Sequence, residues 1–168
     1  MTILELILKF FFPKKFAYRR IEETIIAWTM ACEIYFDNKV VSIPRANAGY
    51  HFFVLGSLDF LCQCFNLSDY DFYVLSGFAL ASVDCSEKES LWIIKNYSKI
   101  LQTSFGKEAI LAGNRTIYKW LSKPDDPKEI PNILRELVSQ WSYPSGVPLE
   151  IKNLVPKTFY TDAERDEL

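Results

Sequence analysis

The sequence predicts an all-α, single-domain bundle of about six or seven helices with a buried central helical hairpin. The chain has 168 residues, a length typical of one domain with a substantial hydrophobic core. Apolar residues recur at steps of three and four along most of the chain, as they do in amphipathic helices. Residues 37–47 hold a short extended-type run, but a lone strand does not make a sheet. We expect the helical domain to span residues 1–143 and an irregular, Pro-containing segment with an acidic tail to follow over 144–168.

An amphipathic N-terminal helix and a basic flank are predicted for residues 1–17, with Pro13 ending the helix. The apolar run is too short to span a bilayer, which needs about 20 apolar residues. Its positive charges follow the apolar block, whereas those of a signal peptide precede it. The helix could dock on its own domain, on a partner or on a membrane surface. The docking residues would be Phe10, Phe11, Lys14, Lys15, Arg19 and Arg20.

A long amphipathic helix is predicted over residues 18–36. Its glutamates lie away from the apolar stripe on the helix circle, so the stripe should face the core. The stripe consists of Ile21, Ile25, Trp28, Cys32 and Tyr35.

Residues 50–65 and 70–83 are apolar nearly all round, so we expect two helices that form the buried centre. Ser68 or Asp69 can cap the second helix. Small residues in both helices would let the two backbones approach closely. These residues are Gly56, Ser57, Ser76, Gly77, Ala79 and Ala81.

Three more helices are expected after the hairpin. A capping box formed by Ser86 and Glu89 begins a helix that runs to about residue 105, where Gly106 supplies a left-handed stop. A helix over residues 107–121 follows, with its own apolar stripe. The last helix begins at Pro127 or Pro131 and has the cleanest amphipathic spacing in the chain. Its apolar residues are Ile130, Ile133, Leu134, Leu137, Val138 and Trp141.

Charge and cysteine content exclude several function classes. The net charge of −2 provides no positive field for nucleic acid, and neither central apolar run is long enough for membrane insertion. The four cysteines lie in apolar, helix-like stretches, which predicts reduced, buried thiols and a cytoplasmic protein. Cys62 and Cys64 would point about 200° apart on a helix, so we predict no metal site and no cofactor.

The motifs of the large nucleotide-binding and hydrolase classes are missing, and no catalytic residue is assigned. His51 is the only histidine, and Asp59 is a carboxylate inside an apolar helix. We expect both to be buried, with Asp59 satisfied by Ser, Tyr or Trp on a neighbouring helix or by Arg115. Their eight-residue separation is about 12 Å along a helix, too far for a direct dyad. A small helical enzyme with a pocket around His51 and Asp59 is the alternative from this pattern.

The sequence favours a non-catalytic protein-binding module of the adaptor, chaperone or inhibitor kind. A bacterial immunity-type protein that neutralises a toxic partner belongs to this class. Aromatic residues make up 15% of the chain and could supply interface anchors for another protein or a second copy. Peripheral membrane association through residues 1–20 is a further alternative. The candidate anchors are Trp92, Asp125, Asp126, Tyr143 and Tyr160.

Overall fold

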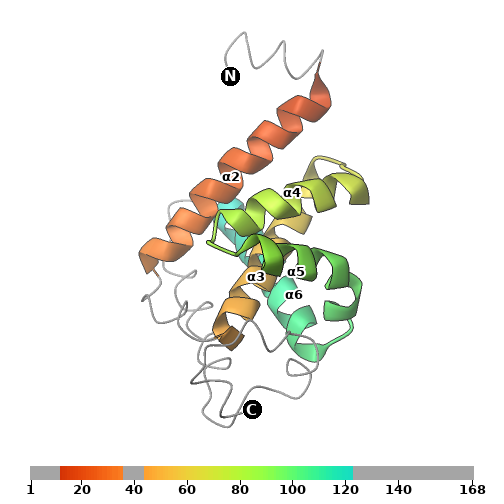
Figure 1. Cartoon of the computed structure of the whole chain (residues 1–168). Coiled ribbons are helices and arrows are strands. Elements are labelled where there is room, and N and C mark those ends of the chain that lie inside the picture. Colours follow the sequence, from red (N-terminus) through yellow and green to blue (C-terminus); the bar gives the residue numbers. More distant parts are fainter. Residues whose placement is uncertain (1–11, 36–43, 123–168) are drawn as a thin grey trace, which may run out of the picture.

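The computed structural model describes residues 12–35 and 44–122, and this part of the chain is helical without strands (Figure 1). The all-α class is therefore confirmed for the described ranges. They hold five helices, while the predicted helices over residues 1–12 and 127–141 and the boundary at residue 143 lie outside them. In chain order the helices are α2 (Pro13–Tyr35), α3 (Pro44–Cys64), α4 (Asp69–Ala81), α5 (Glu87–Ile100) and α6 (Ser104–Ser122).

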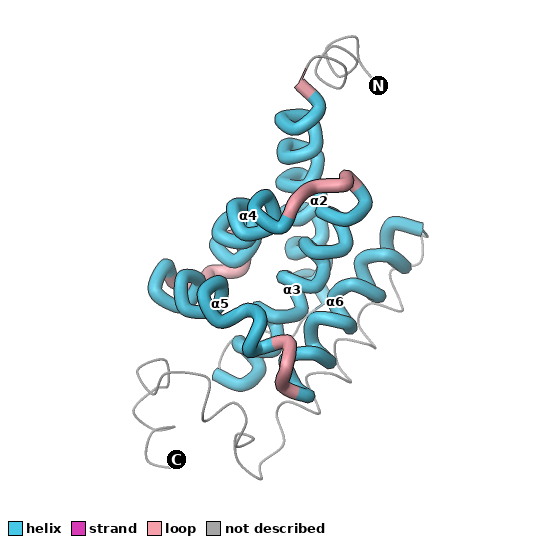
Figure 2. The backbone as a smooth tube through the Cα atoms, turned by 90° about the vertical axis from the view of Figure 1, so that its right-hand side faces the viewer, coloured by secondary structure: helices cyan, strands magenta, loops and turns pink. Residues whose placement is uncertain are grey.

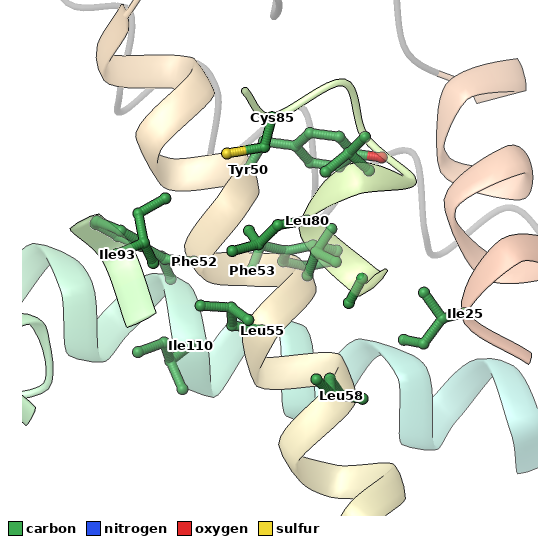
Figure 3. Packing of buried hydrophobic residues seen from close by; sticks show 14 of the residues in the cluster. Ile25, Tyr50, Phe52, Phe53, Leu55, Leu58, Leu80, Cys85, Ile93 and Ile110 are labelled. Carbon is green, nitrogen blue, oxygen red and sulfur yellow. The ribbon is translucent and has the colours of Figure 1, made fainter. Parts of the chain in front are cut away.

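Helix α3 is the centre of the described fold. Every residue from 48 to 58 is buried, because α2, α4 and α6 all pack around this helix. Figure 2 shows α6 along one side of α3 and the α4–α5 pair on another. Ile25, Leu80 and Ile110 reach toward α3 from three other helices (Figure 3). The prediction of a central helix here is confirmed, although α3 begins at Pro44 and not near residue 50.

The closest helix contact joins α3 to α6 and depends on glycine. A Cβ atom at Gly56 would lie 1.9 Å from the Ile110 carbonyl oxygen. One at Gly113 would lie 1.8 Å from the Phe53 carbonyl oxygen. The sequence predicted that Gly56 would bring α3 close to α4, and this is wrong. The glycine that matches it is Gly113, so the two backbones meet at the α3–α6 crossing.

Buried hydrogen bonds of Ser57 stabilise the same α3–α6 crossing. Its hydroxyl accepts a hydrogen bond from Trp28 Nε1 at 3.0 Å. The hydroxyl hydrogen has two acceptors within reach, the carbonyl oxygens of Gly113 at 3.1 Å and of Phe53 at 3.2 Å. One small side chain therefore connects α2, α3 and α6. Trp28 belongs to the predicted inner stripe of α2, whose described side chains Ile21, Ile25, Trp28 and Cys32 are all fully buried.

Helix α4 is covered on one side only. Phe72, Leu75 and Leu80 face the core, whereas Tyr70 and Val74 are exposed. The expectation that both hairpin helices form the buried centre is wrong for α4, because one side of this helix is exposed. The helix lies at the periphery of the described fold, against α2, α3 and α5, and nothing in the described ranges packs on its outer side.

The capping signals are confirmed, and one predicted stop is not. Ser68 is the N-cap of α4 and Ser86 is the N-cap of α5, each with both hydrogen bonds of a capping box. Helix α5 ends at Ile100, and Gly106 lies in the first turn of α6. A Cβ at Gly106 would lie 2.3 Å from the Ile100 carbonyl oxygen, so close packing of this turn accounts for the glycine.

Candidate functional site

The outward side of α4 carries a cluster of exposed apolar side chains. Its members recur at helical spacing, and Tyr70 is 72% exposed, Val74 48% and Tyr73 42%. After Asp71 the helix has no charged residue. We call this surface the α4 face, and it consists of Tyr70, Tyr73, Val74, Gly77, Phe78 and Ala81.

Gly77 leaves a gap in the middle of the α4 face. A Cβ at Gly77 would have no described atom within 4 Å, whereas one at Gly56, Gly106 or Gly113 would collide with a neighbour. A glycine inside a helix costs roughly 1 kcal/mol relative to alanine. The packing of the described residues therefore does not explain why this position is glycine.

Carboxylates border the α4 face at both ends. Asp69 precedes it and Asp84 follows it, and both are exposed. No lysine or arginine occurs from residue 69 to residue 87. The surface therefore has an uncharged apolar centre and acidic ends.

The N-terminal end of α4 is held firmly by Asp71. This buried carboxylate accepts hydrogen bonds from the hydroxyls of Ser68 and Tyr18, and it lies 2.6 Å from Lys14 Nζ. Lys14, followed by Ser68 and Tyr18, keeps the pKa of Asp71 well below its usual range. Burial and the bond to Asp71 raise the pKa of Tyr18 to about 12. This cluster locks α2 onto the start of α4, so the α4 face is presented on a fixed element.

Of the residues predicted as partner anchors, Trp92 alone lies in the described ranges. Trp92 is half-buried and packs against the hydrophobic core, and its carbonyl accepts a hydrogen bond from the Asn96 amide. The other predicted anchors lie outside the described residues. They are Asp125, Asp126, Tyr143 and Tyr160.

The basic flank is largely engaged within the described structure. Lys14 pairs with Asp71, and Arg19 and Arg20 lie 2.8 Å and 3.4 Å from the two oxygens of Glu23. The ammonium of Lys15 sits 5.5 Å from the centroid of the Phe12 ring. Phe10 and Phe11 lie outside the described residues.

His51 and Asp59 occupy α3 but do not form a shared site. His51 is buried, and burial lowers its pKa to about 4, so the ring is neutral at physiological pH. Asp59 is only half-buried, and its carboxylate accepts a hydrogen bond from Gln63 at 2.9 Å. The expected partner on a neighbouring helix is therefore wrong. Gln63 lies four residues later on the same helix, where a long side chain reaches back naturally.

The cysteines form no cluster in the described ranges. Cys32, Cys62 and Cys85 are buried, whereas Cys64 is exposed, which corrects the expectation that every thiol is buried. Cys62 and Cys64 diverge as helical geometry requires. Among the described residues, no group of three or more His, Cys, Asp or Glu side chains is placed to hold a metal ion.

Comparison with known proteins gives no relative: no family model, curated protein or solved structure matches the chain. None of the helices in residues 12–35 and 44–122 is long and apolar enough to cross a membrane. The candidate site therefore rests on the geometry of the α4 face. This face could not be recognised from the sequence, because residues 70–83 are apolar nearly all round and were expected to belong to the buried centre.

Proposed function

We propose that the chain is a non-catalytic protein-binding module that uses the α4 face to bind an amphipathic helix of a partner protein. The observation that carries the proposal is the exposed Tyr70, Tyr73 and Val74 on an uncharged helix surface. Contiguous exposed apolar surface is typical of interaction sites, and tyrosine is enriched among the residues that contribute most to binding.

Charge and shape specify the kind of partner. The acidic ends at Asp69 and Asp84 favour a helix with basic residues beside its apolar stripe. The gap at Gly77 gives a partner backbone room to approach closely. In binding of this type, the partner helix packs its apolar stripe against the apolar surface. The contacts are made by side chains of the partner that lie one helical turn apart.

The proposal covers adaptor, chaperone and inhibitor roles, including neutralisation of a toxic partner by an immunity-type protein. Each of these roles needs a rigid surface that another protein can recognise. The enzyme alternative receives no support from His51, because the ring is buried and its pKa is lowered. The membrane alternative is weakened because Lys14, Arg19 and Arg20 already pair with carboxylates.

Fluorescence anisotropy with two designed helical peptides tests the proposal. Both peptides carry one leucine stripe, but one has lysines and the other glutamates on its flanks. We expect the lysine peptide to bind at least tenfold more tightly than the glutamate peptide. Val74→Ser should weaken its binding at least tenfold.

The matched control is Leu91→Ser, because Leu91 on α5 is as exposed as Val74. This variant should bind the lysine peptide like the original chain. Equal binding of both peptides, or an equal loss in both variants, would contradict the proposal.

A further inference from the structure

Helix α6 carries a second exposed apolar surface, and basic residues lie beside it. Tyr118 is 57% exposed, Leu121 44% and Leu111 41%. Lys107 and Arg115 are exposed on the same side of the helix, because each lies four residues from Leu111. We call this surface the α6 face, and it consists of Lys107, Leu111, Arg115, Tyr118 and Leu121.

Tyr118 has a fixed position on the α6 face. Its ring packs edge-on against the Phe60 ring of α3, with the two centroids 5.8 Å apart. Phe60 in turn packs against the hydrophobic core. An aromatic side chain that is already ordered loses little conformational entropy when a partner binds. Tyr118 is therefore suited to act as an anchor in an interface between proteins.

The α6 face has the chemistry that the α4 face requires of a partner helix, namely apolar residues at helical spacing with basic residues beside them. We infer that the α4 face of one copy of the chain binds the α6 face of a second copy. This inference rests on the proposed function, because it identifies α6 of another copy as the partner helix.

The two faces of one molecule cannot meet. Helix α3 contacts both α4 and α6, and Figure 2 shows these two helices on different sides of α3. The exposed side chains of α4 and α6 point away from the helix that separates them. Contact between the two faces therefore requires a second copy.

The charges of the two helices favour contact between unlike faces. The α4 face has the exposed carboxylates of Asp69 and Asp84 at its ends. Helix α6 has a net charge of +2, from three basic residues and one acidic residue, all of them exposed: Lys107, Glu108, Arg115 and Lys119. Two α4 faces would bring their aspartates together, and two α6 faces would bring their basic residues together. Opposite charges favour the α4–α6 pairing over either of these.

Length and shape also match. Helix α4 has 13 residues and spans about 20 Å, and the segment from Lys107 to Leu121 spans about the same distance. Helices pack when side chains of one enter the spaces between side chains of the other. The gap at Gly77 offers such a space, and Leu111 and Tyr118 are exposed side chains large enough to fill it.

Pairing of unlike faces has a consequence for assembly. When two copies meet in this way, one α4 face and one α6 face remain open. A contact of this kind adds further copies until a ring closes, whereas a contact between like faces stops at a dimer. The average mass in solution should therefore rise as the protein concentration rises.

Sedimentation equilibrium of the full chain tests this inference with two complementary variants. Val74→Asp removes the α4 face, and Leu111→Asp removes the α6 face. Each variant alone should keep the mass of one chain, 19.5 kDa, at concentrations where the original chain associates. An equimolar mixture should form a complex of twice that mass, because one variant keeps its α6 face and the other keeps its α4 face.

The matched control is Leu91→Asp, which places the same charge at a residue of α5 that is 50% exposed. It should associate like the original chain. Circular dichroism should show that all three variants keep their helices, because the substituted side chains are exposed.

Charge reversal tests the electrostatic part of the contact. The double variant Lys107→Glu, Arg115→Glu should associate at least tenfold more weakly than the original chain. The double variant Lys95→Glu, Lys99→Glu makes the same change in net charge at exposed residues of α5 and should associate more strongly than the α6 variant. Equal weakening in both would show that net charge, and not the α6 face, controls association.

Three results would overturn the inference: an original chain that stays monomeric at every concentration, a single variant that still associates by itself, or a mixture that forms no complex. The lysine peptide separates this failure from failure of the proposed function. Leu111→Asp keeps the α4 face and should bind the peptide like the original chain. Peptide binding without self-association would refute only the pairing of copies, whereas an original chain that does not bind the peptide would refute the proposed function itself.

Discussion

Two helix surfaces of this protein place glycine among large apolar side chains, and they use it in opposite ways. At the α3–α6 crossing, carbonyl oxygens of the facing helix occupy the space beside Gly56 and Gly113. On the α4 face, no described atom lies within 4 Å of a Cβ at Gly77. The first surface is already filled and stabilises the fold. The second is open and is available to a partner.

This comparison separates stability from binding. A substitution at the crossing should change the free energy of unfolding, whereas one on the α4 face should change association with a partner.

Gly113→Ala should produce the largest loss of folding stability. The added Cβ would lie 1.8 Å from the Phe53 carbonyl oxygen, which belongs to the backbone and cannot rotate away. Overpacking typically costs about 1–3 kcal/mol, and a backbone clash falls at or above the upper end. Urea unfolding followed by circular dichroism should show a loss of about 3 kcal/mol or more. A loss below about 1 kcal/mol would mean that α6 shifts easily at the crossing.

Ser57→Ala should cause an intermediate loss at the same crossing. The substitution leaves the buried Trp28 indole N–H without its acceptor. Leaving a buried donor unsatisfied costs about 1–3 kcal/mol. Urea unfolding provides the measurement.

The double variant Trp28→Phe, Ser57→Ala is the check on this explanation. Its loss should be smaller than the sum of the two single losses, since the single changes remove the same hydrogen bond. Additive losses would show that packing, and not the hydrogen bond, determines the effect of Ser57.

The sequence could predict the features that depend on neighbours in the chain. The capping box at Ser86 and the inner stripe of α2 follow from residues a few positions apart, and both are confirmed. The Asp59–Gln63 hydrogen bond has the same local origin, and the i, i+4 spacing could have indicated it.

The features that depend on distant parts of the chain could not be predicted. No local signal pairs Gly56 with the segment around Gly113, because the two belong to helices separated by α4 and α5. The open side of α4 has the same cause. Tyrosine and valine occur on both buried and exposed apolar surfaces. Whether Tyr73 and Val74 are buried therefore depends on where the other helices pack.

Acid should weaken the attachment of α2 to α4. The pKa of Asp71 is lower in the folded protein than its unfolded value of 3.8, so its stabilising contribution is complete above about pH 4. That contribution declines as the pH falls below 4, because the unfolded chain then binds more protons than the folded one. Thermal unfolding between pH 7 and pH 2.5 should show a smaller pH dependence in Asp71→Asn. An identical slope in both proteins would assign the acid sensitivity to other carboxylates.

Gly77→Ala should produce the smallest change in the free energy of unfolding, and it should stabilise the protein where the other substitutions destabilise it. Alanine removes the cost of glycine inside a helix and meets no described atom, so unfolding should require about 0.5–1 kcal/mol more free energy.

Gly77→Leu should keep the fold as well, since leucine is also a good helix former, but it would fill the gap on the α4 face. The lysine peptide should therefore bind Gly77→Leu at least tenfold more weakly than the original chain. If Gly77→Ala were destabilising, Gly77 would belong with the glycines of the crossing, and the contrast between the two surfaces would fail. If both variants were stable and bound the peptide normally, the gap would have no part in recognition, and Tyr70, Tyr73 and Val74 alone would define the surface.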